Sequence, residues 1–316
     1  MKKIAVTDYN FKNLEQEKSI IEKAGYVFEP YNCKTKEELI EACGDAVGLL
    51  NQRFYLSEEI LRELPNCKAI VRYGVGVDNI DLEGATKNNI KVGNVPNYCI
   101  NEVADHTISL LLAALRKLPV YNKSVRDGDW SYKVGMPIYQ IQNLNLGVLG
   151  FGKIAQNMVH KIGRMGFKNI FVYDPYVTDE LVEKYDGKKV DFDTLIESCD
   201  CLSINVPLTK STHHIMNREV FKRMKSNAVI VNTGRGQVID EQALIEALHQ
   251  GLISGAGLDV LEKEPIDQDN ELLKMDNVIL TPHVGRYSEE AELRLQQMAA
   301  ENLLEMLAGT LKGLNE

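Results

Sequence analysis

The stretch GVLGFGKIA, residues 147–155, decides the fold expected for this chain. It overlaps the end of an apolar run, NLGVL at 145–149, and opens a helical pattern. Gly150, Gly152 and Ala155 give it the spacing G-x-G-x-x-A. In that context the first glycine permits a tight turn, the second lets the backbone approach a pyrophosphate at the helix N-terminus, and the alanine allows close helix–strand packing. The stretch therefore predicts a dinucleotide-binding βαβ unit.

An acidic residue lies where such a unit needs one. Asp174 follows the next apolar run, NIFVY at 169–173, about 20 residues beyond the glycines. A carboxylate there accepts the two hydroxyls of an adenosine ribose, whereas a 2′-phosphate would meet like charge. Pro175, Tyr176 and Val177 follow, so no Arg or Lys comes immediately after the acid. This pattern predicts a preference for NADH over NADPH; a structural turn with a capping Asp is the alternative interpretation.

Short apolar runs alternate with helical patterns along the chain, which is typical of parallel βαβ units. The runs are apolar throughout, as in strands that helices cover on both faces. A length of 316 residues predicts two domains. We therefore expect an α/β fold with strands at 3–7, 26–29, 46–50, 68–72 and 90–94, and a second series at 145–149, 169–173, 201–205, 228–232, 253–258 and 277–281.

Two long helical patterns and one mixed segment stand apart from this alternation. Residues 102–117 begin with acids and end with bases, which suits a helix dipole. Residues 289–309 follow the last expected strand and are predicted to form a helix that returns to the first domain. Residues 118–142, with the single Trp130, are long, mixed and partly apolar.

Composition excludes several classes of protein. The chain has 45 acidic and 36 basic residues and a net charge of −9, which disfavours direct binding to nucleic acid or anionic membranes. The apolar stretch 108–115 is far shorter than the ~20 residues that span a bilayer, and the first residues do not form a secretory signal. The six cysteines lack C-x-x-C spacing, so we expect reduced thiols, a cytoplasmic location and no metal site.

Three strands of the second series are followed by loops that carry different chemical groups: Arg235 in NTGRG, Glu264 in LEKEP and His283 in TPHVG. In an open parallel sheet the carboxyl ends of the strands form the ligand crevice, so we expect these groups to converge there. The set fits hydride transfer to a 2-keto acid. A histidine donates a proton to the carbonyl oxygen, a carboxylate orients it and stabilises its protonated form, and a guanidinium binds the substrate carboxylate. The alternatives are that Arg235 is an ion-pair partner and Glu264 an ordinary turn residue.

A series of ordered motifs makes the chain resemble the NAD-dependent D-isomer-specific 2-hydroxyacid dehydrogenase family over nearly its whole length. They are RYGVGVDNID (72–81), NVPNYCINEVADH (94–106), GVLGFGKIA (147–155), YDP (173–175), NVPLTKSTHHIMN (205–217), VNTGRGQVIDEQAL (231–244), GAGLDVLEKEP (255–265) and TPHVG (281–285). Arg286 and Tyr287, where small residues are frequent, resemble the branch that contains the C-terminal-binding corepressors and their bacterial relatives. Arg72, two residues before Gly74, resembles the arginine of phosphoglycerate dehydrogenases near the substrate phosphate.

The resemblance implies a Rossmann NAD-binding domain at 101–287 and a smaller, flavodoxin-like parallel-sheet substrate domain at 1–100 plus 288–316. It implies catalytic roles for Arg235, Glu264 and His283. The implied cofactor-binding residues are Gly150, Gly152, Lys153, Ile154, Asp174, Val206, Pro207, Thr212, Thr233, Gly234, Arg235, Asp259, His283 and Gly285. The implied substrate-binding residues are Arg72, Tyr73, Gly74, Val75, Gly76, Arg235 and His283, with the backbone at Val75 and Gly76 holding the substrate carboxylate.

The resemblance also implies partners. It implies that the cofactor is NAD, that the substrate is a small 2-hydroxy or 2-keto acid, and that residues 118–142 form an arm for a homodimer. Arg72 suits a second charge on the substrate or only solvates the rim of the site, and Tyr73 either shapes the pocket or packs. The rival hypothesis is an NAD(H)-sensing, corepressor-like binding protein with little turnover.

Overall fold

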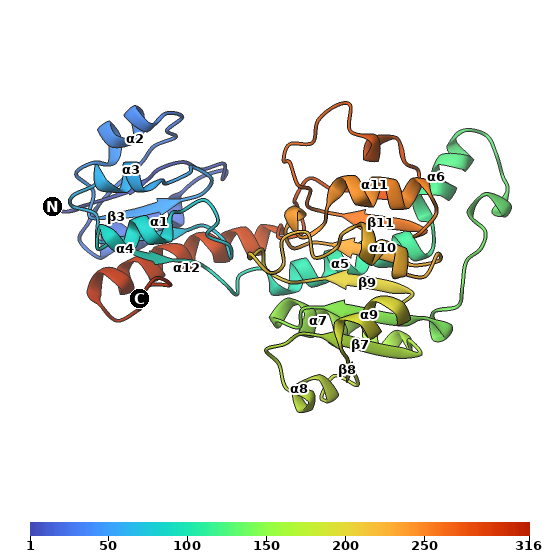
Figure 1. The fold of residues 1–316 in the computed structure, drawn as a ribbon. Coiled ribbons are helices and arrows are strands. Elements are labelled where there is room, and N and C mark those ends of the chain that lie inside the picture. The colour runs from blue at the N-terminus through green and yellow to red at the C-terminus, as the bar shows by residue number, and fades with distance from the viewer. The chain divides into compact units, whose positions relative to one another are not determined.

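The computed structural model describes residues 1–316, which form two compact units. One unit contains Met1–Cys99 and Tyr287–Glu316, and the other contains Ile100–Arg286. Both units are α/β structures with wholly parallel sheets, so the expected fold class is confirmed (Figure 1). No helix combines the length and the apolar character that crossing a membrane requires.

The sheet of the first unit has five strands in the order β2-β1-β3-β4-β5, which is the flavodoxin-like order. Its strands are β1 (Lys3–Val6), β2 (Val27–Pro30), β3 (Gly48–Asn51), β4 (Ala69–Arg72) and β5 (Lys91–Gly93). Its helices are α1 (Glu15–Lys23), α2 (Lys36–Cys43), α3 (Glu58–Arg62), α4 (Leu82–Lys87) and the C-terminal α12 (Glu289–Ala308).

The C-terminal helix α12 packs on this first sheet because glycines in the sheet let it approach. A Cβ on Gly48 would lie 3.2 Å from Leu303, and one on Gly93 would lie 2.5 Å from the sulfur of Met306. Leu303 and Met306 are both buried. The last segment of the chain therefore completes the core of the unit in which the chain begins.

The sheet of the second unit has seven strands in the order β12-β11-β10-β9-β6-β7-β8. Its strands are β6 (Asn145–Leu149), β7 (Asn169–Tyr173), β8 (Lys188–Lys189), β9 (Cys201–Ile204), β10 (Val229–Asn232), β11 (Gly255–Leu258) and β12 (Val278–Leu280). The strand order reverses direction between β6 and β9, as in the doubly wound Rossmann arrangement, and this switch point is where such sheets bind ligands. The strand β8 was not expected from the sequence, because two lysines at a sheet edge carry no apolar signal.

Helices cover both faces of the second sheet and create two separate cores. One core packs α9 (Phe192–Ser198), α10 (Arg218–Arg223) and α11 (Glu241–His249) against the sheet. The other core packs α5 (Ile100–Leu115) and α7 (Lys153–Ile162). Both faces are buried, which explains why β9, β10 and β11 are inaccessible along their whole length. The short α8 (Asp179–Glu183) lies in the connection between β7 and β8.

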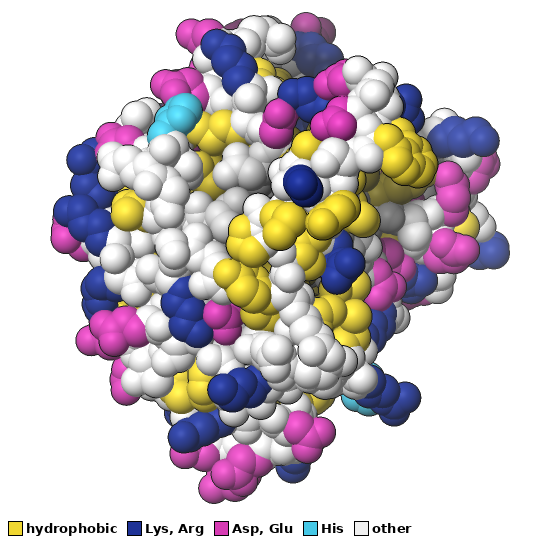
Figure 2. All heavy atoms as spheres, turned by 90° about the vertical axis from the view of Figure 1, so that its right-hand side faces the viewer, with side chains coloured by type: hydrophobic (Ala, Val, Ile, Leu, Met, Phe, Trp, Pro, Cys, Tyr) yellow, Lys and Arg dark blue, Asp and Glu magenta, His cyan; other side chains and the backbone are white.

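Residues 118–142 form α6 (Leu118–Arg126), the 3₁₀ turn η1 (Tyr132–Gly135) and the start of η2 (Ile141–Asn143). No residue of α6 is buried. Figure 2 shows apolar side chains gathered on the face of the molecule over which this segment runs. The exposed apolar residues of the segment are Leu118, Val125, Trp130, Tyr132, Val134, Met136 and Tyr139. The segment thus has secondary structure but leaves most of its apolar side chains in solvent.

Candidate active site

The glycine loop after β6 has the geometry that its sequence predicted. Gly150 has φ +87°, and a Cβ there would lie 2.8 Å from Val206 and strain the backbone. Gly152 is the N-cap of α7, and nothing lies within 4 Å of where its Cβ would be. Ala155, in the first turn of α7, is fully buried. The first position therefore requires glycine for backbone reasons, whereas the second leaves open space beside a helix N-terminus, as a bound pyrophosphate needs.

Asp174 is anchored to this same loop. Its Oδ2 accepts a hydrogen bond from the Phe151 N–H at 2.8 Å, and its Oδ1 accepts one from the Tyr176 N–H at 2.9 Å. Each carboxylate oxygen retains acceptor capacity for a further donor, such as a ribose hydroxyl. The residues present therefore fit the adenosine end of a dinucleotide.

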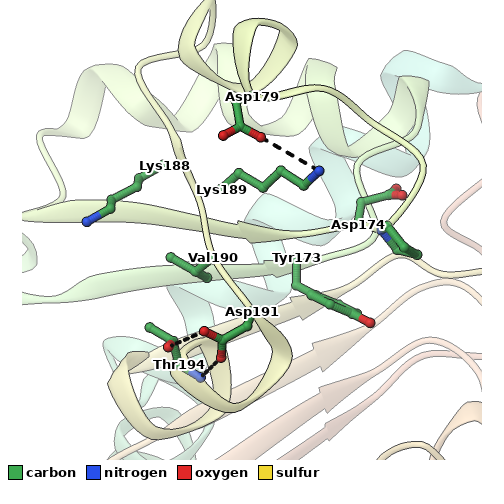
Figure 3. Close-up of a pocket in the computed structure, with 9 residues that line it drawn as sticks. Tyr173, Asp174, Asp179, Lys188, Lys189, Val190, Asp191 and Thr194 are labelled. Atoms are coloured by element: carbon green, nitrogen blue, oxygen red, sulfur yellow. Dashed lines mark hydrogen bonds and ion pairs between the residues drawn. The ribbon is translucent and has the colours of Figure 1, made fainter.

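Asp174 lines a pocket of about 580 Å³ at the carboxyl ends of β7 and β8 (Figure 3). Lys188 and Lys189 of β8 line it as well, which the residues directly after the acid do not reveal because β8 comes later in the chain. The Lys189 ammonium donates to the Val177 carbonyl at 2.6 Å and lies 3.7 Å from Asp179. In Figure 3 the Lys188 side chain points away from Asp174. Lys189 thus already contacts protein oxygens, and Lys188 is directed away from Asp174.

A histidine and a carboxylate meet at the ends of β11 and β12. The Nδ1 of His283 lies 2.8 Å from the Oε2 of Glu264, and both side chains are partly exposed, by 42% and 40%. The other carboxylate oxygen, Oε1, accepts the Leu261 N–H at 3.2 Å. Burial by itself raises the pKa of Glu264, but the hydrogen bond and charge of His283 outweigh it, so the pKa lies below its usual value. The carboxylate is therefore held ionised against one ring nitrogen.

Asp259 organises the loop that carries His283. Its carboxylate accepts the Thr281 hydroxyl at 2.6 Å and the backbone N–H groups of Val284 and Gly285, each at 2.9 Å. Its own carbonyl accepts the His283 N–H at 2.8 Å. His283 has φ +54°, a left-handed conformation that these bonds stabilise. Asp259 is only 2% exposed, so its carboxylate is directed at this loop and away from solvent.

The charge on Asp259 is maintained by the donors around it. Burial alone raises the pKa of this carboxyl, but the hydrogen bonds, with that of His106 the largest among them, lower the pKa to about 2. The His106 Nε2 lies 3.4 Å from Oδ1 of Asp259 and 2.9 Å from the Thr281 hydroxyl. The helix α5, which contains His106, is thereby joined to the loops after β11 and β12.

Arg235 lies in the loop after β10, immediately before the 3₁₀ turn η4 (Gly236–Val238). The buried Asn232 shapes this loop, since its side chain donates to the Arg235 carbonyl at 2.9 Å and accepts the Gly234 N–H at 3.0 Å. A Cβ on Gly236 would lie 1.9 Å from the carbonyl of Leu261. The loop that carries Arg235 therefore packs directly against the loop that carries Glu264.

The remaining residues predicted to bind the cofactor lie at the same edge of the sheet. Lys153 and Ile154 form the first turn of α7, and Gly285 lies in the loop held by Asp259. The Thr212 hydroxyl donates to the Pro207 carbonyl at 2.6 Å, which closes the turn after β9. The Thr233 hydroxyl lies 2.8 Å from that of Thr107 in α5. No group of three or more His, Cys, Asp or Glu side chains has an arrangement that would hold a metal ion.

Five of the residues predicted to bind the substrate, Arg72–Gly76, lie at the end of β4 in the first unit. Gly74 has φ +143°, and a Cβ there would lie 1.7 Å from the Arg72 guanidinium. The Val75 carbonyl accepts the Asn94 side chain at 2.6 Å. Tyr73 is 2% exposed and its hydroxyl donates to Glu17 at 2.9 Å, so its side chain packs inside the unit. Of the two interpretations of Tyr73, packing is the one that the structure supports.

Comparison with known proteins identifies the family. Residues 108–285 match the family model described as "D-isomer specific 2-hydroxyacid dehydrogenase, NAD binding domain". A glyoxylate reductase from Thermococcus litoralis is 40% identical over 260 residues, which cover 80% of this chain and 78% of that protein. The chain belongs to the D-isomer specific 2-hydroxyacid dehydrogenase family, as its motifs predicted.

One further relative and one solved structure are similar over nearly the whole of this chain. The D-3-phosphoglycerate dehydrogenase of Methanocaldococcus jannaschii is 41% identical over 315 residues, 98% of this chain and 58% of that protein. The chain spans a little over half the length of the phosphoglycerate dehydrogenases it matches. A structure of D-lactate dehydrogenase from Aquifex aeolicus with NAD and lactic acid superimposes with a TM-score of 0.87 at 26% identity, covering 99% of each chain.

Replacing Asp259 with Asn is expected to lower the free energy of unfolding by about 2 kcal/mol at pH 7. The pKa of Asp259 is lowered from 3.8 to about 2 in the folded protein, so its stabilisation is complete above pH 4 and is lost as the pH falls toward 2. Denaturant unfolding at pH 7 and pH 3 measures the penalty, which should shrink to about half at pH 3.

The matched control is Asp267→Asn, which removes an exposed carboxylate paired with Lys263. That change is expected to alter stability by no more than about 0.5 kcal/mol at either pH. An equal penalty for Asp259→Asn at both pH values would show that its negative charge is not the source of the stabilisation.

Proposed function

We propose that this protein is an oxidoreductase that interconverts a small D-2-hydroxy acid and its 2-keto acid with NAD(H) as the hydride carrier. The observation that carries the proposal is the His283–Glu264 pair at 2.8 Å, beside the loop of Arg235, at the carboxyl edge of the NAD-binding sheet. The family, and relatives named as phosphoglycerate dehydrogenase and glyoxylate reductase, support the same reaction class.

The geometry of the pair supports a separate role for each ring nitrogen of His283. NAD(H), when bound, supplies or accepts the hydride. Since Nδ1 of His283 is occupied by Glu264, the Nε2 is the nitrogen that donates a proton to the substrate carbonyl oxygen during reduction and removes it during oxidation. Glu264, held ionised, stabilises the imidazolium form that donates this proton.

Binding of the substrate is assigned to two sets of groups. Arg235 provides a guanidinium that pairs with the substrate carboxylate and polarises its carbonyl. The backbone of the Gly74–Gly76 loop, with Arg72 at its start, is the second proposed contact for the carboxylate. A chain with a net charge of −9 needs such local cations to attract an anionic substrate.

Steady-state reduction of a panel of 2-keto acids by NADH, with and without a phosphate group, tests the proposed activity. His283→Ala is expected to lower kcat by ~10²–10⁴-fold on the best substrate, which is the usual effect of losing a general acid. The Kd of NADH should change little, because the ring acts on the substrate carbonyl.

The matched control is His249→Ala, which removes a histidine on the surface at the end of α11. Its kcat is expected to equal that of the wild type. Tight binding of NADH without turnover of any 2-keto acid would contradict the proposed activity and favour the rival, an NAD(H) sensor.

We propose that Asp174 makes the enzyme prefer NADH over NADPH, because each of its oxygens is pre-oriented by a backbone N–H. Lost charge-assisted bonds and added repulsion predict a preference of at least ~10²-fold in kcat/KM. Asp174→Ala should reduce this preference in kcat/KM mainly by weakening the binding of NADH. The binding of NADPH should gain little, since Lys189 already contacts Val177 and Asp179.

Glu183→Ala is the control for this prediction, because it removes one negative charge from the same connection without touching the pocket. It should leave the ratio of the two cofactors unchanged. Equal kcat/KM values for NADH and NADPH in the wild type would remove Asp174 from the ribose-binding role.

We propose a homodimer that buries the apolar side chains of residues 118–142. The support is their exposure: Trp130 is 89% exposed and Tyr132 is 72% exposed. The double variant Trp130→Glu/Tyr132→Glu is expected to shift the molar mass in light scattering from dimer to monomer. Tyr55→Glu, at a 58% exposed aromatic residue of the other unit, should leave the mass unchanged. A monomeric wild type would contradict the proposal.

We also propose that the protein works in the cytoplasm, without nucleic-acid or membrane partners. All six cysteines are free and buried. Burial raises the pKa of Cys43, Cys67 and Cys199 to about 12, which keeps these thiols protonated and unreactive. Such thiols suit a reducing compartment, and the net charge of −9 disfavours polyanionic partners.

A further inference from the structure

Glu262, two residues before Glu264, is held by groups from three different elements. Its carbonyl accepts the Gln237 side chain from η4 at 3.2 Å, and its N–H donates to the Glu241 carboxylate of α11 at 3.2 Å. Its own carboxylate is bonded to the Nε2 of His214, which lies in the turn after β9. Glu262 is therefore one of the points at which the loop after β11 is attached to the rest of the sheet edge.

His214 joins the same loops through its backbone. Its N–H donates to the Gln237 carbonyl at 2.9 Å, and its φ of +51° is a left-handed conformation. The ring of His213 stacks on that of His214 with centroids 3.9 Å apart. One residue thus connects the loop after β9, the loop after β10 that contains Arg235 and the loop after β11 that contains Glu264.

The connection continues directly to the proposed proton-transfer pair. The Leu261 N–H donates to Oε1 of Glu264, whose Oε2 is bonded to His283. Because Gly236 packs against the Leu261 carbonyl without room for a Cβ, this segment has little freedom to move toward the neighbouring loop. A displacement of Glu262 away from the sheet edge would therefore draw the Glu264 carboxylate away from the His283 ring.

The exposure of the His214–Glu262 pair argues that its main contribution is not to stability. The two side chains are 38% and 31% exposed. Ion pairs in contact with solvent contribute little to the free energy of unfolding, because water screens the charges and both side chains lose rotamer freedom. Misplacement of a reacting group by about 1 Å, in contrast, can lower a rate 10²-fold.

We propose that His214 is a positioning residue, which through Glu262 holds the loop so that the Glu264 carboxylate stays against Nδ1 of His283. The inference rests on the proposed function, since it requires that the Glu264–His283 pair takes part in proton transfer. His214 itself touches neither substrate nor the transferred proton in this role. It affects the reaction only by fixing the position of the Glu264 carboxylate.

The test is His214→Asn, because Asn tolerates the left-handed backbone and is too short to reach Glu262. At saturating NADH, kcat for 2-keto acid reduction should fall about 10-fold. The alkaline limb of the pH–kcat profile should move to lower pH, since a displaced Glu264 stabilises the imidazolium less; the other carboxylate near this pair, Asp259, is unchanged. Glu262→Ala should give the same result, and the double variant should be no worse than either single change.

Three further variants separate the possible outcomes. Glu264→Gln, the direct change, should move the alkaline limb further in the same direction. His214→Gln, which restores a hydrogen-bond donor, should recover part of kcat. His249→Asn removes a histidine bonded to Glu271 at 2.7 Å, a pair of the same chemistry away from these loops, and should leave kcat and the pH profile unchanged.

A shifted profile in Glu264→Gln together with wild-type kcat and profile in His214→Asn and Glu262→Ala would overturn the positioning role and leave the proposed function intact. A lower kcat or melting temperature in His214→Asn without a shift of the alkaline limb would show a purely structural role. An unshifted profile in Glu264→Gln itself would instead overturn the proposed role of Glu264. Should His214→Asn fail to fold, Glu262→Gln replaces it, because this change keeps the size of the side chain and removes its charge. A shift of the alkaline limb of its pH–kcat profile would support the positioning role, and an unshifted limb would overturn it.

Discussion

Parallel pairing of neighbouring strands is the constraint on which the site depends. Because β10, β11 and β12 are adjacent and run in the same direction, the loops that follow them leave the sheet at one edge. These loops carry Arg235, Glu264 and His283, whose positions are far apart in the chain. The sheet therefore brings the loops that carry a cation, a carboxylate and an imidazole to one edge, although these residues are not neighbours in the sequence.

Buried polar groups convert this proximity into a defined geometry. Asn232 shapes the Arg235 loop through its side chain, and its carbonyl also accepts the N–H of Asp259 at 2.9 Å. Asp259 in turn holds the His283 loop through both carboxylate oxygens. A buried carboxylate is costly unless donors surround it, so the same hydrogen bonds that keep Asp259 ionised also prevent the loop from taking another conformation. Stability and positioning are here two effects of one network.

At the end of the sheet that we propose binds the cofactor, backbone groups fix the geometry in the same way. Asp174 and the glycine loop follow the neighbouring strands β7 and β6, and the Phe151 N–H joins the two. The acid that we propose to bind the ribose is therefore already oriented by the protein, which reduces the entropy that such binding must overcome. The second glycine, Gly152, leaves space rather than making contacts. At this end the protein contributes a fixed acceptor and an opening at a helix N-terminus.

The apolar runs and the G-x-G-x-x-A spacing determined the α/β class, the positions of nearly all strands and the place of the cofactor loop, because these depend on local periodicity and on backbone conformations that few residues tolerate. The family followed from motifs that lie in order along the chain. Local sequence could not show that β8 places Lys188 and Lys189 beside Asp174, or that Tyr73 directs its hydroxyl inward to Glu17. Nor could it show that His214 contacts Glu262 across three loops. Those arrangements arise only when distant segments pack together, since strand order and loop contacts depend on the whole sheet and leave no periodic signal in the residues themselves.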